Sequence, residues 1–258
     1  MRALIVSDVH SNLEALESVV EDAKNRGGFD EIWSLGDLVG YGPDPSTCIA
    51  LLRLHKLRAV AGNHDLAAFG RLSLESFNDY AAAAARWTAE QISTEDADWL
   101  ASLPLRIEVE DFTMVHGSPR DPVWEYVVSV PVAAVSFQHF TTTRCLVGHS
   151  HVPFLCVTGQ DGPKFLEFRL DDPVPLGNER IIVNPGALTH YGLSLKDALI
   201  DSRLPVIEVH LGNPYARERW RRHSVITDIA RGQIAGFGWR SYTSALQVLA
   251  AIVEEDFG

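Results

Sequence analysis

The stretch "ALIVSDVHSNLEALESVVEDAKNRGG", residues 3–28, combines the features from which the fold can be predicted. Its first four residues are aliphatic, which is typical of a strand that is covered on both faces. Its second half has the apolar spacing of an amphipathic helix, which Ser11 or Asn12 can cap and which a glycine pair ends. Asp8 and His10 stand between the strand and the helix. The stretch therefore predicts the first half of a βαβ unit, with polar side chains at the end of its strand.

The same alternation repeats along the next part of the chain. "EIWSLGDLVG" (31–40) predicts a second strand, a helix follows at about 46–55, and "LRAVAGNHD" (57–65) predicts a third strand and loop. Strands that alternate with helices indicate an α/β fold with a parallel sheet. Beyond about residue 104 the strands are joined by short turns such as "GQDGP" (159–163), which favours antiparallel pairing in that half.

We find no internal repeat, low-complexity tract or linker, so a single domain over residues 1–258 is expected. Within it, the alanine-rich segment at about 66–103 predicts a helical insertion, and about 215–257 predicts a helical C-terminal tail. The insertion could cap a site, pack on the sheet or pair subunits into a homo-oligomer, and the sequence leaves these three alternatives open.

The net charge and the cysteine content of the chain limit which binding partners and which cellular location are expected. The formal net charge of −12 over 258 residues argues against binding to long nucleic acid, which needs a basic surface. A small phosphorylated substrate stays compatible, because bound cations can reverse the local field. The odd number and wide spacing of Cys48, Cys145 and Cys156 give no disulfide framework and favour a cytoplasmic location. The apolar run at the N-terminus is too short for a signal peptide or a membrane span, so no membrane partner is expected.

Polar groups recur where predicted strands end, which is where open parallel sheets place active sites. Each such group alone has an ordinary explanation, because an aspartate there often caps a helix and a histidine is usually a satisfied polar group. Capping does not explain five such motifs, and the alternation of an extended chain points His149 and His151 to the same side. Seven side chains are therefore expected to converge: Asp8, His10, Asp37, Asn63, His116, His149 and His151.

The chemistry of these side chains predicts metal ions. Imidazole, carboxylate and amide ligands together suit Mn, Fe, Zn, Co or Ni rather than Ca. Seven ligands are too many for one ion and natural for two, since a carboxylate can bridge two ions about 3.5–4 Å apart. We therefore expect two divalent transition-metal ions as cofactors, and their identity stays open.

The motif series "DVH…GDLVGYGPDP…GNHD…HGS…GHSH" resembles the calcineurin-like metallophosphoesterase superfamily. It is most similar to the small prokaryotic phosphoesterases whose second motif reads GDxVGYGP. The five motifs occur in order over about residues 7–151, and "VNPGA" extends the resemblance to about residue 190. The resemblance implies a four-layer α/β/β/α sandwich, in which helices flank two mixed sheets and the metals lie at one edge of the packed sheets.

The resemblance also implies a role for each polar residue. One metal would be held by Asp8, His10, Asp37 and His151. The other would be held by Asp37, Asn63, His116 and His149, with Asp37 as the bridge. His64 and Asp65 would be catalytic residues rather than ligands: His64 would face the phosphoryl oxygen or the leaving group, and Asp65 would orient its ring.

The expected activity is that of a metal-dependent phosphoric ester hydrolase, a phosphodiesterase or phosphatase. Hydroxide shared by the two metals would attack phosphorus in line with the leaving oxygen, and a protonated His64 would help to offset the charge that develops. A phosphodiester or nucleotide-type small substrate is favoured; phosphomonoesters, dinucleoside polyphosphates and phosphoproteins are alternatives. A non-catalytic protein-interaction scaffold and a metal-binding sensor are the other readings, and a missing ligand or a missing GNHD histidine would favour the scaffold.

Two further stretches leave alternatives open. In "VNPGALTHY", Asn184, His190 and Tyr191 could border the site, or the Pro-Gly pair could simply form a tight turn. The "GYGPDP" stretch, residues 40–45, could frame a substrate entrance or be a rigid loop.

Overall fold

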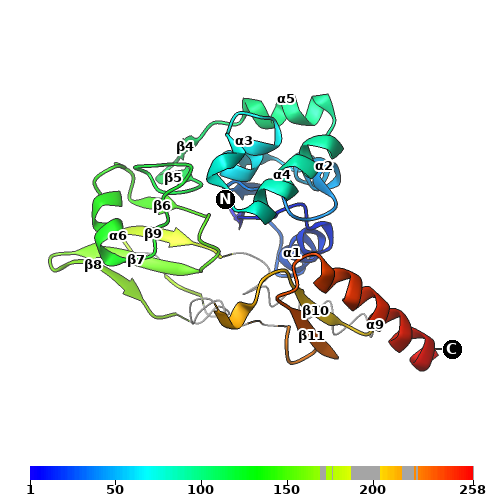
Figure 1. Cartoon of the computed structure of the whole chain (residues 1–258). Coiled ribbons are helices and arrows are strands. Elements are labelled where there is room, and N and C mark those ends of the chain that lie inside the picture. Colours follow the sequence, from blue (N-terminus) through cyan, green and yellow to red (C-terminus); the bar gives the residue numbers. More distant parts are fainter. Residues whose placement is uncertain (169–172, 176, 187–203, 217–223, 225, 258) are drawn as a thin grey trace. The chain divides into compact units, whose positions relative to one another are not determined.

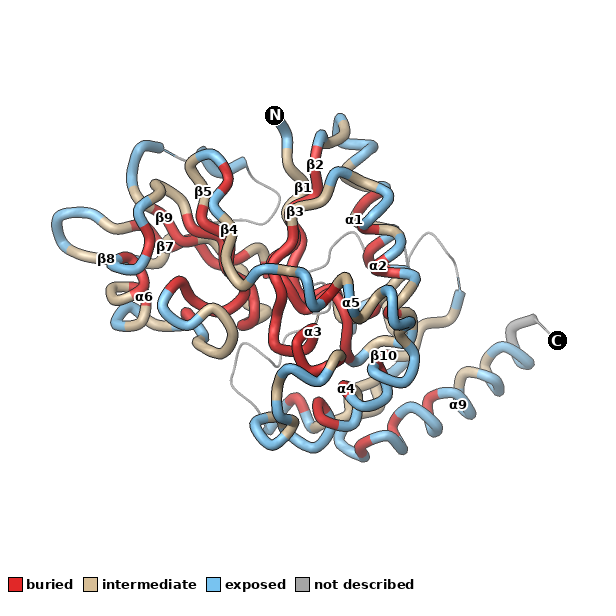
Figure 2. The backbone as a smooth tube through the Cα atoms, turned by 90° about the horizontal axis from the view of Figure 1, so that it is seen from above, coloured by how far each residue is buried: buried red, intermediate tan, exposed pale blue. Residues whose placement is uncertain are grey.

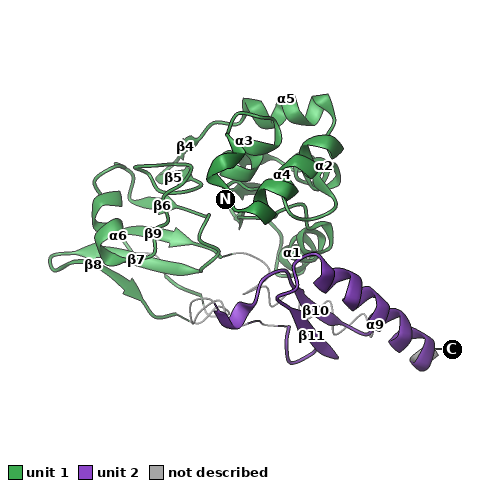
Figure 3. Cartoon of the chain, viewed as in Figure 1, with its two compact units in different colours: residues 1–187 green, residues 188–258 purple. Residues whose placement is uncertain are grey.

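A computed structural model describes the chain except for residues 169–172, 176, 187–203, 217–223, 225 and 258 (Figure 1). The chain divides into two compact units, residues 1–187 and residues 188–258 (Figure 3). The single domain that we expected from the sequence stays a prediction, because a division by compactness does not show whether the two units fold separately. Each unit is described separately below.

The first sheet of residues 1–187 is parallel. It contains β1 (Ala3–Val6), β2 (Glu31–Ser34) and β3 (Leu57–Ala59) in that order. The helices α1 (Leu13–Asn25) and α2 (Pro45–Arg53) connect these strands. The βαβ alternation that the sequence predicts is therefore present, and the three strands end at the same edge.

Helix α1 begins where the sequence predicts it, because the Asn12 side chain accepts a hydrogen bond of 3.1 Å from the backbone N–H of Ala15. The apolar faces of α1 and α2 then pack against the sheet, and Leu16, Ile49 and Leu52 are completely buried. Burying one such side chain contributes about 1.5–3 kcal/mol. Figure 2 shows the buried residues along β2, at the ends of β1 and β3, and on one side of both helices. This packing fixes the strand ends that carry the polar motifs.

The second sheet is mixed and has the strand order β4-β5-β6-β9-β7-β8. Strands β5, β6 and β9 are parallel, whereas β4, β7 and β8 pair antiparallel to their neighbours. The bounds are β4 Arg106–Val109, β5 Phe112–Val115, β6 Arg144–Leu146, β7 Phe154–Gly159, β8 Gly162–Leu166 and β9 Arg180–Asn184. Antiparallel pairing in this half agrees with the short turns in its sequence.

The two sheets share one buried apolar cluster. Trp33 and Leu35 from the first sheet pack with Met114 and Leu146 from the second. On the second sheet, the helix α6 (Val130–Ser136) contributes Ala133 to a separate buried cluster. Helices therefore flank packed sheets, and the α/β sandwich that we expected is confirmed.

The segment that follows β3 is helical. It contains α3 (Asn63–Ala68), the short 3-10 helix η1 (Leu74–Ser76), α4 (Asp79–Gln91) and α5 (Thr94–Ser102). Asn78 and Ser93 cap α4 and α5 through their side chains. The buried alanines of α4 let this helix approach α3 and α2 closely, so the segment packs on the helix that begins with Asn63.

Residues 188–258 contain a two-stranded parallel sheet of β10 (Ile207–His210) and β11 (Gly232–Ala235). The 3-10 helix η2 (Pro214–Ala216) lies between them in sequence, and α9 (Arg240–Phe257) packs on both strands. Among its described residues, the tail expected to be helical from about residue 215 holds the strand β11 as well as the long helix α9, which begins at Arg240. In the described part of the chain, no helix has both the length and the apolar character needed to span a membrane.

Candidate metal centre

The seven side chains predicted to converge do so, at the ends of strands from both sheets. Asp8 and His10 follow β1, Asp37 follows β2, Asn63 begins α3, His116 follows β5, and His149 and His151 follow β6. His10 and His151 are partly accessible and the other five are buried. The edge where the sheets meet therefore collects two carboxylates, an amide and four imidazoles.

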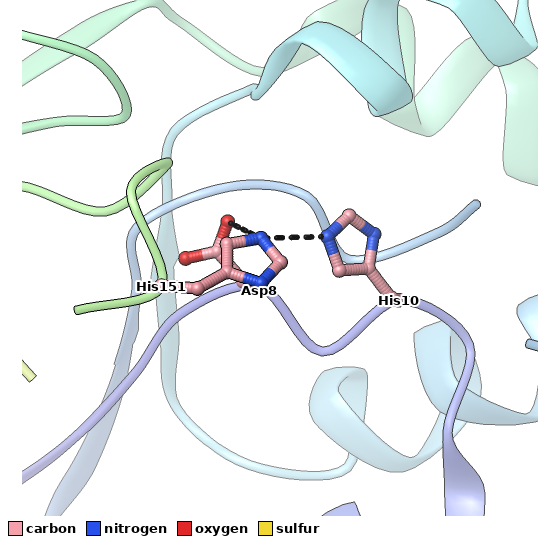
Figure 4. A group of neighbouring side chains, drawn as sticks. All are labelled: Asp8, His10 and His151. Carbon is pink, nitrogen blue, oxygen red and sulfur yellow. Dashed lines mark hydrogen bonds and ion pairs between the residues drawn. The ribbon is translucent and has the colours of Figure 1, made fainter. Parts of the chain in front are cut away.

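One group of possible ligands surrounds His151 (Figure 4). Its Nε2 atom lies 3.3 Å from Asp8 Oδ1 and 3.3 Å from His10 Nε2. His10 Nε2 lies 3.7 Å from Asp37 Oδ2. Two atoms that each bind one cation at about 2.1 Å are themselves about 3.0–3.5 Å apart at tetrahedral or octahedral angles. These spacings suit shared coordination of one ion.

A second group surrounds His116, which is completely buried. Its Nε2 atom lies 3.4 Å from Asp37 Oδ2, 3.1 Å from Asn63 Oδ1 and 3.1 Å from His149 Nδ1. Asp37 Oδ2 therefore lies within 3.7 Å of a histidine from each group, as a bridging ligand would. A further group of possible ligands consists of His10, Asp37 and His64, so His64 also lies within reach of an ion held there.

The burial of the donor atoms is a second reason to expect divalent cations at this site. His149 Nε2 is buried and has no hydrogen-bond partner among the described residues, and buried Asp8 Oδ1 has an ion-pair contact with His151 but no hydrogen bond there. Buried polar atoms without partners are costly, and an ion offsets that cost for a carboxylate. Burial lowers the pKa of His10 to about 3 against the opposing effect of Asp37, and burial with the charge of His116 lowers the pKa of His149 to about 4. Both imidazoles are therefore neutral near pH 7, the state that binds metal.

Backbone carbonyls aim two of the rings. His116 Nδ1 lies 2.8 Å from the Leu35 carbonyl oxygen, and His10 Nδ1 lies 3.2 Å from that of Val39. Such contacts fix the tautomer that leaves Nε2 free for a cation. Burial lowers the pKa of His116, but the Asp37 and Asp8 carboxylates and the Leu35 carbonyl together raise it to about 9.

The backbone at the site is unusual. The φ angle is positive at five of the seven side chains: Asp8 (53°), His10 (51°), Asp37 (52°), His149 (63°) and His151 (59°). A residue with a side chain pays about 1–2 kcal/mol for this left-handed conformation. Strain of this kind gathers at functional sites, where the surrounding structure holds it in place. Backbone hydrogen bonds supply that support here, for example from His10 N–H to the Asp37 carbonyl (2.9 Å).

Glycines in the motifs make room for the side chains. A Cβ atom at Gly62 would collide with Asp37 Oδ1, and one at Gly40 would lie 2.6 Å from His64 Nδ1. The glycines of "LGDLVG" and "AGNHD" therefore have a steric role beside the ligands.

His64 and Asp65 are both buried beside the centre. The ring centroid of His64 lies 4.9 Å from that of His10, and its Nδ1 has no hydrogen-bond partner among the described residues. Asp65 does not orient this ring as we expected. Its carboxylate accepts backbone N–H groups of Val39 (3.1 Å) and Gly62 (2.9 Å), because the third residue of α3 turns back to cap the helix. Burial and the charge of Asp37 raise the pKa of Asp65 to about 7.

Asn184 has a structural role. Its amide donates to the Gly148 carbonyl (2.7 Å) and to Ser150 Oγ (3.0 Å), and its Oδ1 accepts the N–H of Gly186 (2.7 Å). It thus braces the loop that carries the last two histidines and closes the turn. His190 and Tyr191, the other two residues considered for the border of the site, lie outside the described residues.

Four aromatic residues next to the centre were not singled out from the sequence: Tyr41, Phe77, Trp124 and Tyr126. The sequence pointed only to Tyr41, because it belongs to the "GYGPDP" stretch that we considered as a possible frame of a substrate entrance. Phe77 comes from one segment and Trp124 and Tyr126 from another, and only the folded chain brings these segments together.

The family model described as the calcineurin-like phosphoesterase superfamily domain matches residues 1–200. The chain belongs to this superfamily. An uncharacterized protein of Methanocaldococcus jannaschii is 39% identical over 192 residues, which are 71% of this chain and 74% of that protein. The superfamily assignment makes the protein a phosphoric ester hydrolase, and calcineurin-like phosphoesterases use divalent metals.

Solved structures agree with the superfamily. The crystal structure of a metallophosphoesterase from Sphaerobacter thermophilus is 46% identical, with a TM-score of 0.61 over 73% of this chain and 77% of that one. A hypothetical protein from Pyrococcus horikoshii OT3 has a TM-score of 0.57 over the same shares at 17% identity, which supports the fold alone.

The C-terminal part is similar to a different family. The model described as dehydroquinase class II matches residues 174–250. A 3-dehydroquinate dehydratase of Herpetosiphon aurantiacus is 64% identical over 66 residues, 26% of this chain and 46% of that enzyme. One of Roseiflexus castenholzii is 61% identical over 69 residues, 27% and 44% of the two chains. The chain thus spans about half the length of these dehydratases.

Proposed function

We propose that residues 1–187 form a dinuclear metal-dependent phosphoesterase that acts on a phosphodiester or nucleotide-type small substrate. The observation that carries this proposal is Asp37, whose Oδ2 atom lies within 3.7 Å of both His10 and His116, the histidines of the two ligand groups. A carboxylate in that position can hold two ions close together. The mixture of imidazole, carboxylate and amide donors supports Mn, Fe, Zn, Co or Ni as the ions.

The ligand roles follow the two groups. Asp8, His10, Asp37 and His151 would hold one ion, and Asp37, Asn63, His116 and His149 would hold the other. Two divalent ions in such a site lower the pKa of water and offset negative charge on phosphoryl oxygens. The carbonyls of Leu35 and Val39 keep His116 and His10 aimed at the centre.

His64 would act on the substrate directly. Its backbone N–H donates to Asp37 Oδ1 (2.9 Å), which ties its position to the bridging carboxylate. Its Nδ1 is buried against Gly40, so Nε2 would be the atom that donates a proton to a phosphoryl or leaving-group oxygen. Burial lowers the pKa of His64, which makes its protonated form a stronger acid once it has formed. Asp65 would position the loops of Asp37 and Asn63 through its two backbone contacts.

Hydrolysis of bis(4-nitrophenyl) phosphate tests the proposal. Activity should vanish after chelation and return with Mn²⁺ or Zn²⁺. Asp37→Ala should lose both ions, whereas His64→Ala should bind them and lose about 10²–10⁴-fold in kcat, the usual contribution of a general acid. Asp161→Asn, in the turn between β7 and β8, is the matched control and should behave as wild type. Full activity in the presence of chelator would contradict the metal dependence.

We also propose a reduced, cytoplasmic setting. Cys48, Cys145 and Cys156 are all unpaired and buried, and free buried thiols are usual where disulfides do not form.

A further inference from the structure

Aromatic side chains from three separate segments border the candidate metal centre. Tyr41 lies in the loop after β2, Phe77 lies between η1 and α4, and Trp124 and Tyr126 lie between β5 and α6. We call these four residues the aromatic rim. Each contacts an imidazole of the site, so the rim belongs to the surroundings of the reacting group.

On one side the rim lies against the first ligand group. The Tyr41 ring centroid is 4.9 Å from that of His10 and 4.6 Å from that of His64. Phe77 meets His64 edge to face, with ring centroids 5.2 Å apart. Tyr41 and Phe77 thus enclose the proposed proton donor.

On the other side the rim reaches the second ligand group. Trp124 lies 5.1 Å from Phe77 and 6.4 Å from His149, measured between ring centroids. Tyr126 is stacked on His149, with a centroid distance of 4.0 Å and an interplanar angle of 12°. The rings form an unbroken series from one ligand group to the other.

The two ends of the rim are accessible. Tyr41 is 45% exposed and Tyr126 is 46% exposed, whereas His64 and His149 beneath them are 5% and 6% exposed. Tyr80 on α4 is equally exposed (50%), so what distinguishes Tyr41 and Tyr126 is that their accessible rings lie on buried histidines of the site. Tyr41 and Tyr126 therefore retain surface that a bound molecule can cover.

The backbone of Tyr41 gives an independent reason to regard its ring as functional. Its φ angle is 61°, a conformation that glycine adopts easily and a bulky residue rarely does. The residues on either side, Gly40 and Gly42, show that the loop otherwise uses glycine. A tyrosine retained in this strained position points to a use for its side chain.

We propose that the aromatic rim binds a planar aromatic group of the substrate, an aryl group or a nucleobase, beside the phosphoryl group. This inference rests on the proposed function, since it specifies the ester that the same centre hydrolyses. Stacking on protein aromatic side chains tolerates any flat ring, so the rim selects for planarity rather than for one base. An ester with a saturated substituent would lose that interaction.

Two esters with the same leaving group isolate the effect. Phenyl 4-nitrophenyl phosphate and cyclohexyl 4-nitrophenyl phosphate both release 4-nitrophenolate and differ in whether the retained six-membered ring is flat. We expect the phenyl ester to have about a tenfold higher kcat/KM with the Mn²⁺-loaded full chain, the scale of one stacking contact. Tyr126→Leu and Tyr41→Leu should bring the ratio of the two kcat/KM values toward one.

Control variants separate binding from structure. Tyr80→Leu changes a tyrosine of α4 that is 50% exposed and lies outside the rim, and it should keep the wild-type ratio. Tyr126→Phe retains the ring and should keep it as well. Tyr41→Gly relieves the backbone strain, so it should unfold at an equal or higher temperature and yet lose the selectivity.

The outcomes distinguish the two proposals. A wild-type ratio near one, or a ratio that Tyr41 and Tyr126 variants leave unchanged, would overturn the rim proposal while chelator-sensitive hydrolysis of both esters upheld the proposed function. Failure of the wild-type protein to hydrolyse either ester with any of the metals would overturn the proposed function itself.

Discussion

Asp37 shows how much one side chain organises at the residue scale. Its Oδ1 accepts the N–H of His64 at 2.9 Å, and its Oδ2 faces His10 and His116. Its carboxylate also lies against Gly62, where no side chain can be accommodated. Short-range contacts thus fix where this carboxylate lies and which groups surround it. A single substitution can change each of these contacts.

Gly62→Ala should abolish metal binding. The φ angle of Gly62 is −96°, which alanine adopts freely, so the added methyl group acts by colliding with Asp37, both at its carboxylate and at its backbone nitrogen (2.5 Å). Titration calorimetry with Mn²⁺ would show the loss. Gly159→Ala is the matched control, because a Cβ atom there has no neighbour within 4 Å, and it should bind as wild type. Unchanged affinity of Gly62→Ala would show that Asp37 can move without consequence.

Glu31 predicts a pH dependence of stability that is separate from the metal centre. Its buried carboxylate accepts from Arg58 Nε (2.8 Å), pairs with Lys56 and accepts from Trp33 Nε1 (3.0 Å), and these partners lower its pKa from 4.5 to about 2. A lowered folded-state pKa contributes stability that is complete above the unfolded-state value and is lost as pH falls through the folded-state value.

Glu31→Gln should therefore be less stable than wild type at pH 7, and the difference in unfolding free energy should shrink between about pH 4.5 and pH 2. Urea unfolding followed by tryptophan fluorescence measures it. Glu17→Gln, at an exposed position of α1, provides the comparison. A difference that stayed constant down to pH 2 would contradict the role of the Glu31 charge.

The sequence predicts the site residues well where the signal is local. Asp8 and Asp37 each follow an apolar run, and the strands before them end at the same edge of the first sheet. His116 has the same signal in the second sheet, where it follows β5. The role of Asp65 was not predictable, because the sequence "GNHD" is compatible with two uses of its carboxylate. It could hold the ring of His64, or it could accept backbone N–H groups at the start of α3, as it does. Trp124 and Phe77 were missed because their proximity depends on the packing of segments far apart in the chain.

At the element scale, strands and helices of residues 1–187 follow from periodicity, capping residues and turns. Strand β11 in the expected helical tail did not, since "GQIA" is too short to show a period and is stabilised by pairing with β10. A further local feature is the tight turn between β4 and β5, where exposed Glu110 has a φ angle of 52°.

Glu110→Gly should stabilise the protein by about 0.5–1 kcal/mol. Glycine removes the left-handed penalty of about 1–2 kcal/mol and gives back part of it through the greater entropy of the unfolded chain. Lys164→Gly, at an exposed position within β8, should instead destabilise by about 0.5–1 kcal/mol. Urea unfolding of both variants gives the signs, and a destabilised Glu110→Gly would mean that the side chain itself supports the turn.

On the scale of the whole molecule, the chain joins a phosphoesterase unit to a dehydroquinase-like part. The sequence did not predict this division. Strand and helix signals look alike in all α/β folds, and the composition of the sequence shows no linker between the two parts. All seven proposed ligands lie in residues 1–187. We therefore expect metal binding to change the unfolding free energy of that unit and to leave the unfolding free energy of residues 188–258 unchanged.

Calorimetric unfolding should therefore show two transitions. The unit with β10 and β11 should unfold first, because its described residues form only a two-stranded sheet with α9 packed on it, a smaller core than that of residues 1–187. Adding Mn²⁺ at about 100 times its Kd should stabilise the other unit by about 2.7 kcal/mol and raise only the upper transition. A single transition that moves as a whole with Mn²⁺ would show instead that the units unfold cooperatively.

The buried cysteines have a practical consequence for such experiments. Burial raises the pKa of Cys145 to about 12 and that of Cys156 to about 11, and burial together with Asp44 raises that of Cys48 to about 12. Hardly any reactive thiolate exists near neutral pH. The native chain thus offers a silent background for maleimide chemistry, so a fluorophore or spin label attached through one introduced surface cysteine can be used without first replacing the natural ones.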